Sequence, residues 1–90
     1  MKNYNYKVLI YGKSKEFLHN LNSPKIQKQL YDTINEIRAD PYKSKFKHLK
    51  NTEGLKRARS GKYRIIFFIE DENIYITKIS LRKDAYKRMK

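Results

Sequence analysis

The first third of the chain shows two apolar patterns with different periods. Residues 4–11 predict a β-strand in which Tyr6, Val8 and Ile10 point one way and Lys7, Leu9 and Tyr11 the other. Gly12 interrupts the alternation, and an apolar stripe at helical spacing follows. We expect a short helix there, with Ser14 as its N-cap and Glu16 in its first turn, where the helix dipole favours a negative charge. The stripe consists of Phe17, Leu18 and Leu21.

A second amphipathic stretch has clear signals at both ends. Ser23 is a suitable N-cap, and Pro24 fits the first helical position, where its missing N–H costs nothing. Asp40-Pro41 is a strong stop signal, so the helix should run from residue 24 to about residue 39. We expect the two helices to form a hairpin that lies on a sheet. The apolar positions of the second helix are Ile26, Leu30, Ile34 and Ile37.

The second half of the chain is strand-like. Residues 63–70 are apolar on both faces, which is typical of a central strand. The acidic segment 70–73 predicts a turn, and residues 74–81 form the returning strand of a hairpin. The preceding segment, residues 42–52, is basic and poorly periodic. We expect a loop with at most a short strand there, anchored by Phe46 and Leu49.

The charge of the chain restricts its partners. Ninety residues suffice for one domain, and a net charge of +13 is extreme for that size, which implies an anionic partner such as nucleic acid. Residues 43–64 contain nine lysines or arginines and a single acid, so much of the excess is local. The chain has no cysteine, no signal-peptide pattern at its start and no apolar run long enough to span a bilayer. We expect a cytoplasmic protein with no membrane partner.

Three arginines surround a predicted tight turn at Ser60-Gly61-Lys62. Arg57 and Arg59 are two residues apart, so in a strand both side chains lie on one face of the sheet. Arg64 follows the turn, and strand pairing across the turn would bring all three guanidinium groups into one patch. Such a patch repels itself unless an anion binds it, and guanidinium matches the oxygens of a phosphate. The neighbouring cations with the same expected role are Lys56, Lys62, Lys47 and Lys50.

Other kinds of site are not indicated. His19 and His48 are far apart in the sequence and lack neighbouring ligands at metal-binding spacing. The acids at residues 70–72 are typical of a solvated turn, and the three glycines stand alone rather than in a phosphate-binding loop. We therefore expect neither a metal nor another cofactor. Tyr86, near Arg82, adds an aromatic ring beside a cation, a combination that suits an unstacked RNA base next to its phosphate.

The order of elements and the motif from Arg59 through Gly61 to Tyr63-Arg64, followed by Arg82 and Tyr86, resemble the RelE/ParE superfamily of toxin–antitoxin ribonucleases. The resemblance covers essentially the whole chain. It implies a compact single α+β domain over residues 1–90, with a twisted, mainly antiparallel sheet and an N-terminal helical hairpin on one face. It also implies a metal-independent ribonuclease that cuts mRNA in the ribosomal A site and is blocked by an acidic antitoxin.

The resemblance also assigns roles to residues. In such enzymes the ribose 2′-hydroxyl attacks the adjacent phosphate, and cations stabilise the transition state. By position, Arg57 and Arg64 match catalytic cations, and Arg82 and Tyr86 match a C-terminal pair for phosphate contact and for base stacking or proton transfer. Many relatives carry a histidine where this chain has Leu81, and no glutamate clearly replaces the general base of some relatives. This departure favours the subgroup that works through cations and tyrosine.

Two alternatives share the same basic residues. The first is a ParE-like toxin that poisons DNA gyrase, although relatives of that type tend to lose the cationic constellation that is present here. The second is a non-catalytic RNA-binding module, which would show salt-sensitive binding without cleavage. Inhibited translation with intact DNA would favour the ribonuclease over the gyrase poison.

Overall fold

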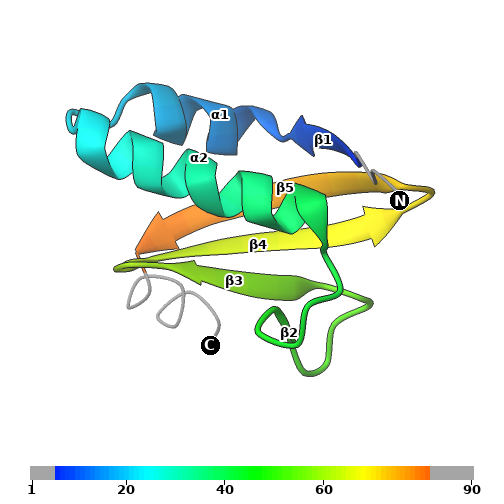
Figure 1. Cartoon of the computed structure of the whole chain (residues 1–90). Helices are drawn as coiled ribbons and strands as arrows, with labels where there is room; N and C mark the ends of the chain where they lie inside the picture. The colour runs from blue at the N-terminus through cyan, green and yellow to red at the C-terminus, as the bar shows by residue number, and fades with distance from the viewer. Residues whose placement is uncertain (1–5, 82–90) are drawn as a thin grey trace.

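The structure is a computed structural model and describes residues 6–81, which form a five-stranded sheet with two helices (Figure 1). The strand order is β1-β5-β4-β3-β2, and neighbouring strands are antiparallel except β1 and β5, which are parallel. Both helices cover the same face of the sheet, which confirms the expected α+β fold. In chain order the elements are β1 (Lys7–Ile10), α1 (Gly12–His19), α2 (Pro24–Ala39), β2 (Lys47–His48), β3 (Lys56–Ser60), β4 (Tyr63–Glu70) and β5 (Asn73–Leu81).

The predicted limits of α2 are confirmed. The Ser23 side chain accepts a hydrogen bond from the backbone N–H of Ile26 at 3.2 Å, and Pro24 occupies the start of the helix. The helix ends at Ala39, directly before Asp40-Pro41. The cap, the proline and the stop are local signals, because each acts through backbone groups within a few residues of itself. The segment 42–52 is also as expected, since it contains only the two-residue strand β2.

The predicted start of α1 is wrong. The helix begins at Gly12, with Tyr11 as an N-cap that makes no side-chain capping bond, and no acid lies in its first turn. The Tyr11 backbone N–H donates to the carbonyl of Ile76 on β5 at 3.0 Å, so the sheet holds the point where strand β1 passes into the helix. Ser14 is therefore the third residue of the helix, three positions beyond the cap, and is buried.

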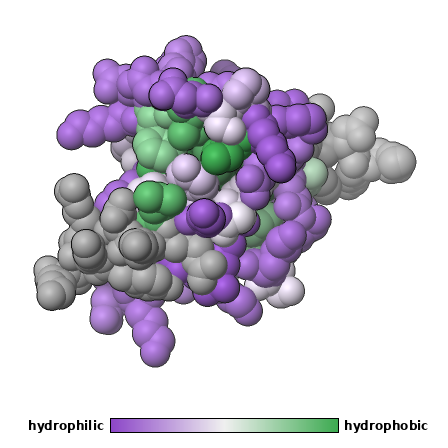
Figure 2. Space-filling view, turned by 90° about the vertical axis from the view of Figure 1, so that its left-hand side faces the viewer, coloured by the Kyte–Doolittle hydropathy of each residue, from purple (hydrophilic) through white to green (hydrophobic). Residues whose placement is uncertain are grey.

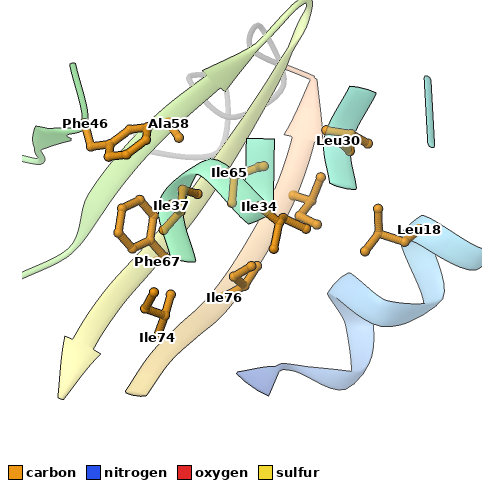
Figure 3. Close-up of a cluster of buried hydrophobic side chains, with 11 residues drawn as sticks. Leu18, Leu30, Ile34, Ile37, Phe46, Ala58, Ile65, Phe67, Ile74 and Ile76 are labelled. Carbon is orange, nitrogen blue, oxygen red and sulfur yellow. The ribbon is translucent and has the colours of Figure 1, made fainter. Parts of the chain in front are cut away.

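A single core lies between the helices and the sheet (Figure 3). Leu18 of α1 and three residues of α2 point toward the central strands β4 and β5, which confirms that residues 63–70 form the middle strand. Phe46, from the loop before β2, packs edge-on against Phe67 of β4, with ring centroids 5.9 Å apart. The fully buried members of the core are Leu18, Leu30, Ile37, Ala58, Ile65, Phe67, Ile74 and Ile76.

The turn between β4 and β5 holds two side chains in a backbone conformation that favours glycine. Asp71 and Glu72 have φ angles of 53° and 65°, and they form a two-residue loop between the paired residues Glu70 and Asn73. Asn-Gly is the preferred sequence for a hairpin turn with two positive φ angles. We expect the double substitution Asp71→Asn/Glu72→Gly to raise the free energy of unfolding by about 1 kcal/mol, measured by urea denaturation.

The other two-residue turn provides the control for this prediction. Gly61 has a φ of 62°, whereas Lys62 does not have a positive φ. Lys62→Gly should therefore lower the free energy of unfolding by about 0.5–1 kcal/mol, because glycine adds chain entropy to the unfolded state without relieving strain. If both substitutions changed the free energy of unfolding in the same direction, the explanation from backbone strain would be contradicted.

Candidate nucleic-acid interface

The turn between β3 and β4 brings the three predicted arginines together. Arg59 lies directly opposite Arg64 in the antiparallel pair, and Arg57 lies opposite Ile66. Directly opposed residues point to the same side of a sheet, and Arg57, Arg59 and Arg64 therefore share one face. That face is the one without helices, because the alternate residues of β3 and β4, such as Ala58, belong to the core.

The outer strands add two lysines to this face. Lys47 of β2 pairs with Arg57, and Lys78 of β5 pairs with Ile66. One row across four strands therefore reads Lys47, Arg57, Ile66 and Lys78, and the adjacent row reads Arg59, Arg64 and Ser80. We call the following five residues the cationic face: Lys47, Arg57, Arg59, Arg64 and Lys78.

Lys78 was not predicted from the sequence, because a β-bulge changes the alternation of β5. The register shifts between Ile66 and Phe67, so that Ile66 faces Lys78, Phe67 faces Ile76, and Thr77 is the extra residue. The Thr77 hydroxyl donates to the carbonyl of Ile66 at 3.3 Å. Strict alternation would have placed Lys78 on the same side as the core residue Ile76. The only sequence signal is that Ile76 and Ile79, both core residues, are three positions apart.

The five cations differ in exposure. Arg64 is only 2% exposed and is one of the largest buried side chains of the described domain, whereas Arg59 and the two lysines are exposed and Arg57 is half-buried. A guanidinium group that is shielded from water interacts more strongly with an anion than an exposed one does. Arg64 thus carries the charge of the cationic face that is most shielded from water.

The hairpin that carries the arginines is held against α2. The Ser60 hydroxyl donates to the carbonyl of Gln29 at 3.3 Å and accepts from the Thr33 hydroxyl at 2.9 Å. A side chain at Gly61 would displace the Gln29 amide group, and the φ of 62° at this position independently favours glycine. These contacts fix the turn from the helix side. Seen from the end of the molecule where this turn lies, most of the described surface is hydrophilic (Figure 2).

Lys56, predicted to bind phosphate, lies apart from the arginines. It is 5% exposed, and its ammonium group donates to the carbonyl of Pro41 at 2.8 Å and lies 5.2 Å from the centre of the Tyr42 ring. Lys56 alternates with Arg57 along β3, so it points to the helix side and holds the segment after α2. We therefore leave Lys56 out of the proposed phosphate-binding set. The sequence indicated a cation here but could not indicate the face of the sheet.

Burial lowers the pKa of Lys56, with a smaller opposing contribution from Asp40. Because the folded-state pKa lies below the unfolded value, the unfolded chain holds more protons between the two values, and stability rises with pH across that window. We expect the wild type to gain stability relative to Lys56→Met as the pH rises from 7 toward 10.5, measured by urea denaturation at several pH values. The matched control is Lys50→Met at an exposed position, for which the difference should stay flat. If the stability difference between the wild type and Lys56→Met also stayed constant with pH, the lowered pKa of Lys56 would be contradicted.

The remaining predicted cations fall into two locations. Lys62 is exposed in the β3–β4 turn, next in the chain to the paired strands of the cationic face. Lys50 is exposed in the loop between β2 and β3, at the opposite end of β3 (Figure 1). Arg82 and Tyr86 lie outside the described residues.

Other lysines of the basic loop belong to the helix side. Lys45 and Lys43 pair with Glu36 of α2, at 2.8 Å and 3.5 Å. The hydrogen bond from Lys45 is the main reason that the pKa of Glu36 is lowered. Exposed pairs of this kind contribute little to stability. They nevertheless show that Lys47, and not the whole loop, adds charge to the cationic face.

Residues 6–81 show neither of two other functional features, a metal site and a membrane span. No group of three or more histidine, cysteine, aspartate or glutamate side chains there is arranged to hold a metal ion. No helix in that range has the length and apolar character needed to cross a membrane.

Comparison with known proteins gives a consistent result at the level of structure. No family model and no curated protein matches the chain in sequence. Among solved structures, the archaeal RelE–RelB complex from Pyrococcus horikoshii OT3 matches with a TM-score of 0.70 and 27% identity, over 87% of this chain and 96% of that chain. The RelB–RelE complex from Methanococcus jannaschii matches with a TM-score of 0.72 and 21% identity, over 91% and 99%.

The isolated RelE toxin of E. coli has the same fold at still lower sequence similarity. Its TM-score is 0.73 at 16% identity, and the match covers 94% of this chain and 99% of that chain. The matches therefore cover nearly the full length of each of these three proteins. The resemblance found in the sequence is confirmed by the structure, and this chain is RelE-like.

Proposed function

We propose that this chain is the toxin of a toxin–antitoxin pair and acts as a ribosome-dependent, metal-independent endoribonuclease that cleaves mRNA in the A site. The observation that supports this proposal most directly is the cationic face. Arg57, Arg59 and Arg64 lie on the side of the sheet without helices, with Arg59 and Arg64 directly opposed. Opposed like charges repel each other across a strand pair, and a bound anion would reduce that repulsion.

The proposed reaction follows from the chemistry of these cations. The ribose 2′-oxygen attacks the adjacent phosphorus, the bond from phosphorus to the 5′-oxygen breaks, and a 2′,3′-cyclic phosphate remains. Negative charge builds up on the phosphoryl oxygens in the transition state, where the buried Arg64 guanidinium would stabilise it most strongly. The 2′-hydroxyl loses a proton and the leaving 5′-oxygen gains one. Arginine is a poor base, so we assign the proton transfer to Tyr86, with Arg82 as a further phosphate contact.

Positioning of the substrate by the ribosome would offset the lack of a histidine–glutamate pair. An orienting partner can supply a large part of a barrier reduction by holding the reacting atoms in line. The exposed cations Lys47, Lys50, Lys62 and Lys78 are suited to contact RNA phosphates around the cleavage position. The site of action would then be the cytoplasm, where ribosomes translate the message.

An acidic antitoxin is the second proposed partner. The complexes from P. horikoshii and M. jannaschii pair RelE with RelB. This chain carries a net charge of +13, which an acidic protein would complement. An antitoxin that covers the cationic face would prevent RNA from binding to it.

The proposed function is tested by primer extension on mRNA in a cell-free translation reaction. We expect the purified protein, free of antitoxin, to cut within codons of translated messages and to leave the same messages intact when initiation is blocked. Salt-sensitive RNA binding without cuts would favour the non-catalytic binding module, and inhibition of gyrase supercoiling without cuts would favour the gyrase poison.

A further inference from the structure

We propose that a hollow next to the cationic face binds one unpaired base of the RNA and selects bases that carry an exocyclic amino group. The hollow lies between the loop of residues 52–55 and the end of β4 at residues 68–70. This inference rests on the proposed function, because it assumes that RNA phosphates occupy the cationic face. It concerns which base lies beside those phosphates.

The hollow lies near the arginines, on the side of the sheet without helices. Phe68 follows Arg64 and Ile66 at alternate positions of β4, so all three point to the side without helices. Phe68 is two residues beyond Ile66, which is the partner of Arg57, and thus about 7 Å from that row along the strand. An RNA chain whose phosphate contacts Arg57 could therefore turn an adjacent base into the hollow.

An aromatic ring with a fixed orientation lines the hollow. Phe68 stacks on Tyr75 of β5, with ring centroids 4.7 Å apart and an angle of 11° between the rings. Both side chains are only partly buried, and Phe68 lines the hollow. Aromatic rings beside a cationic groove are a common way to hold bases of single-stranded RNA, because every base can stack.

Two carboxylates lie at the rim of the hollow, one on each side. Glu53 comes from the loop and Glu70 from the end of β4, and both are exposed. A carboxylate only accepts hydrogen bonds, so it pairs with the amino group of adenine, cytosine or guanine and disfavours the carbonyl oxygen that uracil presents instead. The same charges repel phosphates, which keeps the RNA backbone on the cationic face and leaves the base for the hollow.

The loop wall is held in place before any ligand binds. The Thr52 hydroxyl donates to the carbonyl of Leu49 at 2.8 Å, and the Leu49 N–H donates to the carbonyl of Leu55 at 2.9 Å. Asn51 and Gly54 have φ angles of 60° and 86°, which give the loop its two sharp bends. A wall that is already ordered reduces the entropy lost on binding, so a single base can be recognised there.

The test is to measure the binding of 2′-O-methylated oligocytidine and oligouridine hexamers to the full chain by fluorescence anisotropy. These oligomers cannot be cut, and cytosine and uracil have the same ring size, so their difference isolates the amino group. We expect the wild type to bind oligocytidine about fivefold to tenfold more tightly. Glu53→Gln/Glu70→Gln should bring this ratio close to one, because an amide can pair with either base. Phe68→Leu should weaken the binding of both oligomers.

The matched control is Asp71→Asn/Glu72→Gln, which also removes two negative charges but outside the hollow. It should tighten the binding of both oligomers equally and leave the ratio unchanged. If the wild type binds both oligomers equally, or if the glutamate variant keeps the wild-type ratio, the base site is refuted while RNA binding by the cationic face stands. A glutamate variant that keeps the ratio and instead loses affinity for a protein partner would assign the hollow to that partner. If the wild type binds neither oligomer, both this inference and RNA binding by the cationic face fail.

Discussion

Arg64→Ala is expected to reduce the rate of mRNA cleavage by about a hundredfold to a thousandfold, the range found when one group that stabilises a transition-state charge is removed. The reason is the position of Arg64, which is 2% exposed on the cationic face and lies directly opposite Arg59. Its charge is therefore less screened by water than those of the exposed cations beside it. The measurement is the rate at which cut message appears in primer extension.

Two controls separate the loss of a charge from the loss of the fold. Arg64→Lys keeps the charge but not the planar fork, so it should retain more activity than Arg64→Ala. Arg38→Ala removes an exposed arginine from the last turn of α2, on the helix side, and should leave cleavage unchanged. All variants are compared by circular dichroism and thermal unfolding. A folded Arg64→Ala variant that cuts at the wild-type rate would falsify the assignment of the site.

Phe67→Ala is expected to lower the free energy of unfolding by about 3–5 kcal/mol, a large share of the stability of a domain of this size. Phe67 is fully buried in the central strand and packs edge-on against Phe46. Alanine would leave a cavity between the sheet and the segment before β2, and it would also remove the aromatic contact. Urea denaturation of the purified variant measures the loss.

The adjacent residue supplies the comparison. Phe68 is next in the chain but points to the side of the sheet without helices, where it is only partly buried. Phe68→Ala should therefore cost less than half as much stability, and its main effect should be on RNA binding. Equal losses of stability at the two positions would show that Phe68 is packed as tightly as Phe67, contrary to the structure.

The parts of the fold that depend on neighbours in the chain could be predicted from the sequence. The limits of α2 follow from Ser23, Pro24 and Asp40-Pro41, because capping and proline sterics act over a few residues. The central position of β4 follows from apolar residues on both of its faces, since only an inner strand covered on both sides tolerates them. The grouping of Arg57, Arg59 and Arg64 follows from alternation and a two-residue turn.

Other features depend on contacts between distant segments, and only the tertiary structure decided them. The bond from Tyr11 to Ile76 sets the start of α1 and turns Ser14 from an expected cap into a buried residue. The bulge at Thr77 moves Lys78 onto the cationic face, and the carbonyl of Pro41 binds Lys56 on the helix side. The main elements and the cluster of arginines can be predicted from the sequence, because local backbone chemistry specifies both. Strand pairing and packing decided which lysines join that cluster, because a shift of one residue moves a side chain to the other face of a sheet.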